Sequence, residues 1–158
     1  MGQTITYKPI GGVESVALYP PDAVRSVLFA TNGCMVIFSG QAVELPLLED
    51  RSYYEEVSKY DEGARCVSHT LHLVAAPDSA AMCLTEEFLE QAYFEGFVAK
   101  ILLCDGRCLF AGYSAHLQDE QPLRLESVTT SSGSEVRQTP TVTLRLHSCD
   151  TEFSQRML

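Results

Sequence analysis

The stretch from Thr139 to Ser148, TPTVTLRLHS, carries the clearest secondary-structure signal in the chain. Between Val142 and His147 apolar residues alternate with polar or charged ones. Successive side chains of a β-strand point to opposite faces of a sheet, so this alternation predicts a strand with one buried and one solvated face. We expect two sets of side chains on those faces, with Val142, Leu144 and Leu146 inward and Thr143, Arg145 and His147 outward.

Neighbouring segments extend this β pattern. Leu123 to Thr130 is expected to be a strand that pairs with the first one across a polar loop. Further upstream, the apolar runs Phe97 to Cys104 and Arg107 to Gly112 flank Asp105-Gly106, a dipeptide typical of tight hairpins. We therefore expect a two-residue turn at Asp105-Gly106.

The N-terminal third alternates short apolar runs with turn residues. We expect strands at Glu14 to Tyr19, Cys34 to Phe38 and Gln41 to Leu48, with a hairpin turn at Ser39-Gly40 between the last two. The segment from Ala23 to Ala30 fits either a strand or a short helical turn.

A further hairpin is expected where Ser52 to Lys59 and Arg65 to Ala75 flank Tyr60-Asp61-Glu62-Gly63, a longer loop that Gly63 can close with a positive φ. In its second arm the residues of one face are apolar, apart from His69. The apolar members of that face are Val67, Leu71 and Leu73.

One helix of about ten residues is predicted after Pro77. Thr85 is a good N-cap, Glu86 follows it at the positive end of the helix dipole, and Gly96 is suited to end the helix in the left-handed conformation. Four residues share one face at helical spacing, namely Phe88, Leu89, Ala92 and Tyr93.

These elements together predict a mainly β, antiparallel fold, either a β-sandwich or a partly closed barrel, with one flanking α-helix. A chain of 158 residues is the size of one ordinary domain. We expect a single β-rich domain over residues 1–158, with an N-terminal arm at 1–12 and a C-terminal tail at 149–158.

The composition narrows the classes of function. The formal net charge of −10 disfavours tight nucleic-acid binding, which needs concentrated basic side chains. No apolar run approaches the roughly 20 residues of a membrane helix, so we expect a cytoplasmic protein without membrane contact. The six cysteines are scattered, several of them inside apolar stretches, which favours reduced core thiols.

The candidate chemical motifs do not assemble into a site. His69 and His72 lie three apart, so on a strand they point to opposite faces and cannot share one metal ion. A two-residue turn at Asp105-Gly106 likewise separates Cys104 from Cys108.

Candidate catalytic and cofactor motifs are equally incomplete. Ser114 and His116 lack the Gly-x-Ser-x-Gly elbow of a serine hydrolase. Glycine-rich phosphate-binding loops of the Gly-x-Gly-x-x-Gly or Walker type are also missing. We predict no catalytic residue, no metal, no cofactor and no enzymatic activity.

Three stretches carry a resemblance to a known class of proteins. They are Gly11 to Pro20, the unit from Thr85 to Gly112, and the segment from Leu123 to Asp150. In these the chain resembles structural proteins of tailed bacteriophages and prophages, in particular the tail-tube class and the prophage tail-like proteins of Bacteroides-type bacteria.

The resemblance implies a structural protein that forms homo-oligomeric rings, usually hexameric, with other tail proteins as partners and a place in a virion or tail-like particle. It also implies a loop that contacts the next ring. The hairpin from Ser52 to Ala75 is the candidate for that loop, with Tyr53, Tyr54 and Tyr60 as its contact residues. An acidic tube lining would repel DNA that passes through it.

Two other classes of function remain open. A monomeric β-barrel or sandwich that binds a small ligand or a protein partner would contain a deep apolar pocket with a few polar groups. An enzyme would bring Ser114, His116 or paired carboxylates within hydrogen-bond reach of one another.

Overall fold

The computed structural model describes residues 12–49, 51–114, 117–133, 139–150 and 152–158. The predicted fold class is confirmed: the described residues form antiparallel strands and a single α-helix, α1 (Glu86–Phe94). The strands are β1 (Val13–Tyr19), β2 (Val24–Ala30), β3 (Gly33–Phe38), β4 (Val43–Glu44), β5 (Tyr53–Asp61), β6 (Ala64–Ala75), β7 (Val98–Leu103), β8 (Cys108–Ala111), β9 (Tyr113–Ser114), β10 (Asp119–Glu120), β11 (Arg124–Ser131), β12 (Thr141–Asp150) and β13 (Gln155–Arg156).

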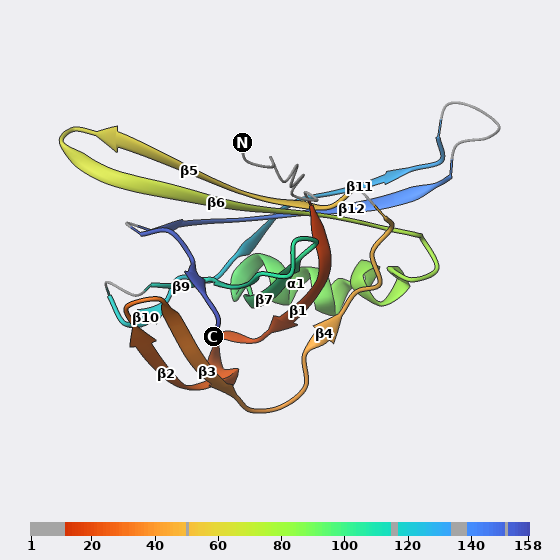
Figure 1. Ribbon diagram of the computed structural model, residues 1–158. Helices are drawn as coiled ribbons and strands as arrows, with labels where there is room; N and C mark the ends of the chain where they lie inside the picture. The colour runs from red at the N-terminus through yellow and green to blue at the C-terminus, as the bar shows by residue number, and fades with distance from the viewer. Residues whose placement is uncertain (1–11, 50, 115–116, 134–138, 151) are drawn as a thin grey trace, which may run out of the picture.

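The strands form layers rather than a closed barrel in the described part of the chain. A long four-stranded sheet has the order β11-β12-β6-β5, and a five-stranded sheet has the order β13-β8-β7-β1-β4. Helix α1 and the five-stranded sheet lie on the same side of the long sheet (Figure 1). The hairpin β2–β3 lies beyond the five-stranded sheet and forms a third layer (Figure 1).

The main core fills the space between the two large sheets and the helix. Leu18 of β1, Leu71 of β6 and Ile101 of β7 have no exposed surface there. The alternation in β12 is confirmed, since its three inward residues are buried and the residues between them are not. Burial of these apolar side chains supplies the main driving force for folding.

A second, smaller core joins the hairpin β2–β3 to the outer face of the five-stranded sheet. Cys34, Val98 and Phe110 are buried in it. Phe110 meets the ring of Phe38 edge-on at 5.8 Å between centroids and stacks on Tyr113 at 5.5 Å. The hairpin β2–β3 is therefore held against the five-stranded sheet by its own set of apolar contacts.

The predicted hairpin at Ser39-Gly40 is wrong. β3 pairs with β2 across a turn at Thr31-Asn32, and β4 pairs with β1. Most of the predicted strand from Gln41 to Leu48 is irregular, with only Val43–Glu44 in a ladder. The backbone N–H of Ser39 donates to the carbonyl of Ala23 at 2.7 Å, which closes the base of the observed hairpin.

The predicted turn at Asp105-Gly106 contains one more residue than expected. The N–H of Leu103 donates to the carbonyl of Arg107, so the loop holds Cys104, Asp105 and Gly106. Gly106 has a φ of 93°, as three-residue hairpin loops require. The Asp105 carboxylate accepts the N–H of Arg107 at 3.0 Å and favours this longer loop.

The predicted helix is confirmed, with one difference on its apolar face. It ends before Gly96, which has a φ of 76°. Phe88 and Ala92 are buried and Leu89 is half-buried, but Tyr93 is largely exposed. Helix α1 flanks the edge strand β11, so the end of its apolar face extends past the sheet.

The side chain of Thr85 caps this helix, because its Oγ1 accepts the N–H of Phe88 at 3.3 Å. We expect Thr85→Ala to lower the free energy of unfolding by about 1 kcal/mol, since one helical N–H loses its acceptor. Thr85→Ser keeps the hydroxyl and serves as the control. Urea unfolding measures both variants, and equal stability of the alanine variant and the wild type would contradict the capping role.

The predicted hairpin around Gly63 is confirmed and is longer than expected. β5 and β6 pair as far as Asp61 and Ala64, which leaves Glu62-Gly63 as a two-residue turn with positive φ at both positions. The hairpin projects beyond the body of the molecule (Figure 1).

The segment predicted as a C-terminal tail makes specific contacts. β13 pairs with β8, and Met157 forms a parallel bridge with Cys34 of β3. Residues 152–158 thus connect the five-stranded sheet to the hairpin β2–β3. Residues 1–11 of the predicted N-terminal arm lie outside the described residues.

Among the described residues, no helix has the length and apolar character to cross a membrane.

Candidate functional site

A buried polar cluster lies where the C-terminal segment crosses the inner face of the long sheet. His69 of β6 is its centre. Its Nδ1 lies 2.6 Å from the Tyr54 hydroxyl, 3.2 Å from Glu56 Oε2 and 3.3 Å from the Ser154 hydroxyl. Burial, and next the charge of Glu56, raise the pKa of Tyr54 well above its ordinary value.

The cluster resembles a catalytic triad in composition but not in geometry. In a triad the nucleophile and the acid contact different nitrogens of the histidine. Here Ser154 and Glu56 both approach Nδ1, while Nε2 donates to the backbone carbonyl of Glu152 at 3.0 Å. The side chain of Glu56 also accepts the N–H of Ser154 at 2.7 Å. The cluster therefore fastens the segment after β12 to β5 and β6.

The other sequence candidates for chemistry are separated. His69 faces the core, whereas His72 is paired with Arg145 on the outer face, as the strand period predicts. Ser114 is fully buried, and its hydroxyl accepts the N–H of Leu117. His116, the proposed partner of Ser114, lies outside the described residues. In the part of the chain that the structure describes, no three metal-ligating side chains gather.

The three tyrosines predicted as contact residues have different surroundings. Tyr60 is 77% exposed near the tip of the projecting hairpin. Tyr53 stacks on His72 on the outer face of the long sheet, with ring centroids 4.5 Å apart. Tyr54 points inward to the polar cluster. Only Tyr53 and Tyr60 therefore present their rings at the surface.

The described hollows are surface grooves. One groove, of about 750 Å³, is lined mainly by polar side chains, among them Glu120, Arg124, Glu126 and His147. The space between the two large sheets is filled by the side chains of the main core. A second groove, of about 680 Å³, has a more apolar lining that includes Val16, Leu45, Pro46 and Leu102.

The outer face of the hairpin β2–β3 is an exposed apolar surface. Leu28 is 66% exposed, Met35 59% and Ile37 62%. Leu28 and Met35 are directly opposite in the ladder, and Ile37 lies two residues along from Met35. We call these three residues the hairpin patch. Contiguous exposed aliphatic side chains on a folded protein are typical of a surface that binds another molecule.

A second apolar surface lies between α1 and β11. It is a groove of about 450 Å³ whose lining includes Leu84, Leu89, Tyr93, Phe94, Leu125 and Val128. Phe94 is 70% exposed and meets the ring of Tyr93 edge-on at 5.0 Å. Glu86 and Glu90 also line this groove, which we call the helix groove.

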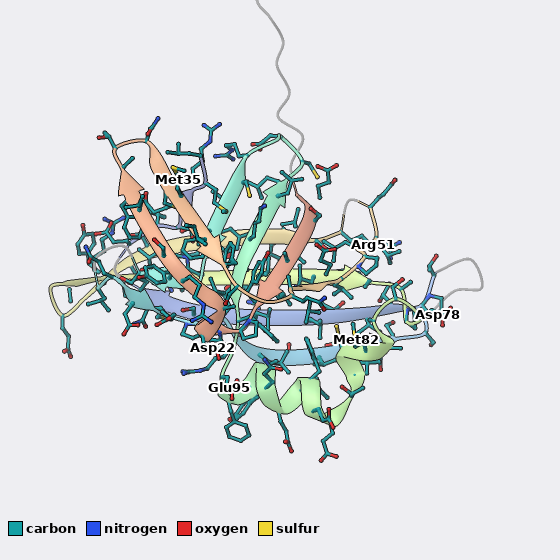
Figure 2. The ribbon with its side chains drawn as sticks, turned by 90° about the horizontal axis from the view of Figure 1, so that it is seen from below. Asp22, Met35, Arg51, Asp78, Met82 and Glu95 are labelled. Atoms are coloured by element: carbon teal, nitrogen blue, oxygen red, sulfur yellow. The ribbon has the colours of Figure 1, made fainter. Side chains whose placement is uncertain are left out.

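The two surfaces are far apart. Met35 on the hairpin and Glu95 at the end of the helix lie on opposite sides of the molecule in Figure 2. Sequence reasoning missed both surfaces. A signal exists in β2 and β3, where apolar residues occupy both faces, a pattern that usually indicates a strand covered on both sides.

No family model, no curated protein and no solved structure matches this chain.

Proposed function

We propose that the chain is a non-enzymatic structural protein that assembles head to tail with further copies of itself. In this arrangement the hairpin patch of one copy occupies the helix groove of the next. The observation that carries the proposal is the pair of distant and dissimilar apolar surfaces on one small chain. A contact between two different surfaces leaves one of each free at the ends and so builds rings or filaments.

The charges of the two surfaces support this pairing. The hairpin patch holds no charged side chain, and the nearest exposed charge on its strand is Arg25 at the bulge of β2. The helix groove carries Glu86 and Glu90. Two copies that each carry a net charge of −10 repel one another generally, so contact is favoured where carboxylates are absent or face a cation.

The resemblance in the sequence gives the proposed assembly a biological setting, that of a phage or prophage tail component of the tube class. In that setting head-to-tail contact closes a ring, and the projecting hairpin β5–β6 reaches the next ring. Tyr60 at the exposed end of this hairpin is the residue best placed for such a contact. The partners are then other copies of the chain and other tail proteins.

The test uses two variants that each damage one surface. We expect Met35→Asp and Phe94→Asp each to weaken self-association about 100-fold, because a carboxylate trapped in an apolar contact costs about 3 kcal/mol. Size-exclusion chromatography with light scattering measures the mass across a range of concentrations. Thr129→Asp, at an exposed site on β11 outside both surfaces, is the control that keeps assembly.

Mixing the two variants distinguishes the possible contacts. A head-to-tail contact predicts a dimer with one copy of each, because Met35→Asp still has a helix groove and Phe94→Asp still has a hairpin patch. A twofold contact through the hairpin predicts dimers of Phe94→Asp alone. A wild-type protein that is monomeric at every concentration would overturn self-assembly altogether.

A further inference from the structure

Two cysteines of the long sheet lie in contact on its outer face. The Sγ atoms of Cys66 on β6 and Cys149 on β12 are 3.5 Å apart. Cys149 is opposite Ser68 in the ladder, so the two cysteines are diagonal neighbours on adjacent strands. We propose that Cys66 and Cys149 are a redox site that low-molecular-weight disulfides convert to an intramolecular disulfide. This inference is independent of the proposed assembly.

The two sulfur atoms need to move only a short distance to form a bond. A disulfide requires the sulfurs to approach by about 1.5 Å more. Within the described residues the β6–β12 ladder extends to the pair Val67 and Asp150, so Cys66 lies just past this pair and Cys149 lies next to it. Cys66 is held by its pairing with Lys59 of β5, but Cys149 is next to the last residue of β12. Rotation about the Cα–Cβ bond of Cys149 and slight movement of that strand end are less restrained than in the middle of the sheet.

Exposure selects Cys149, and the short distance between the sulfurs selects Cys66, from the six cysteines, all of which fall within the described residues. Cys34 and Cys83 are buried in the two cores. Cys104 and Cys108 are half-buried, and the thiol of Cys108 contacts the sulfur of Met157 at 3.7 Å. Cys149 alone is exposed, and Cys66 is half-buried beside it. A dissolved oxidant therefore reaches Cys149 first, with Cys66 in place to attack next.

The reaction is a thiol–disulfide exchange in two steps. Cys149, after loss of its proton, attacks one sulfur of oxidised glutathione and expels a glutathione thiolate. Cys66, also deprotonated, then attacks the Cys149 sulfur of the mixed disulfide and expels the second glutathione thiolate. The two protons released by the protein end on the two glutathione thiols. The protein loses two electrons, and one oxidised glutathione gains them.

The bond closes a loop between residues 83 apart in sequence. A cross-link of that span restricts the unfolded chain far more than the folded one, in which the strands are already paired. We expect oxidation to raise the melting temperature by roughly 5–10 °C. The bond also ties the outer part of the hairpin β5–β6, next to the pair Tyr60 and Arg65, to β12.

The experiment incubates reduced protein with oxidised glutathione, blocks the remaining thiols with N-ethylmaleimide under denaturing conditions, and measures intact mass. We expect four of the six cysteines to be alkylated in the product. Peptide mapping should then find the peptide of Cys66 joined to that of Cys149. Dithiothreitol should restore six alkylated cysteines and the lower melting temperature.

Single variants test the order of the steps. Cys66→Ser should stop at the mixed disulfide of Cys149 with glutathione, and Cys149→Ser should form no internal bond. Cys108→Ser is the matched control and should oxidise as the wild type does. Four outcomes in the wild type would overturn the proposal: unchanged thiols, glutathione on both cysteines, a bond to another cysteine, or a bond between copies.

Discussion

Truncation of Phe110 to alanine is expected to lower the free energy of unfolding by about 3–5 kcal/mol. The ring is almost fully buried and holds the second core together between Phe38 and Tyr113. Its removal takes away buried apolar area and leaves a cavity that the paired strands β7 and β8 cannot close. The hairpin β2–β3 loses the centre of its attachment at the same time.

Phe94→Ala is the matched control, because it removes the same side chain from a site where the ring is 70% exposed. Its cost should stay within about 0.5 kcal/mol. Urea unfolding followed by circular dichroism measures both variants at a concentration where the protein is monomeric. Similar losses in the two variants would mean that Phe110 does not hold the second core together.

Alkaline pH is expected to destabilise the wild type more steeply than Tyr54→Phe. The pKa of Tyr54 is raised in the folded state by burial and by the charge of Glu56, whereas in the unfolded chain it is near 10.0. Below pH 10 both states keep the proton, and the full stability is present. Above that pH the unfolded state releases the proton and the folded state does not, so stability falls by about 1.4 kcal/mol per pH unit.

The measurement is the free energy of unfolding of wild type and Tyr54→Phe between pH 9 and 11.5, with the difference in slope as the readout. Tyr60→Phe removes an exposed phenol from the same hairpin and serves as the control, which should keep the wild-type slope. Equal slopes for wild type and Tyr54→Phe would show that the Tyr54 phenol ionises in the folded protein as it does in the unfolded chain.

Those parts of the fold that depend on neighbouring residues could be predicted from the sequence. Thr85 and Gly96 bound the helix through their own backbone preferences and hydrogen bonds. The alternation in β12 and the position of a turn at Gly63 are likewise local, although the loop there is shorter than expected. In each case the residues that decide the structure lie within one turn or one strand.

Partner choice between strands could not be predicted in the same way. Ser39-Gly40 is a reasonable turn, but β3 gains the aromatic contacts of the second core only when it pairs with β2. The loop at Cys104 to Gly106 is supported by hydrogen bonds from the N–H and the Nε of Arg107 to the carboxylate of Asp105. Spacing alone cannot distinguish a two-residue from a three-residue turn there.

The candidate contact surfaces could also be predicted from the sequence only in part. Tyr53 and Tyr54 were both predicted as contact residues, but adjacent residues of a strand point to opposite faces. Tyr54 points inward and bonds to Ser154, 100 residues away. The hairpin patch could not be predicted, because the sequence does not show that the outer face of β2 and β3 stays uncovered among the described residues. Contacts between segments so distant in the chain leave no local pattern.

The closing segment, residues 152–158, makes folding depend on contacts between segments that are far apart in the sequence. Contacts such as that between Tyr54 and Ser154 form only after a very large loop has closed, and chains rich in them fold slowly. Until the segment docks, the edges of β3 and β8 that it covers have unpaired backbone groups, and such edges pair readily with other chains. Aggregation therefore competes with this last docking step, and dilution during refolding determines how much native protein is recovered.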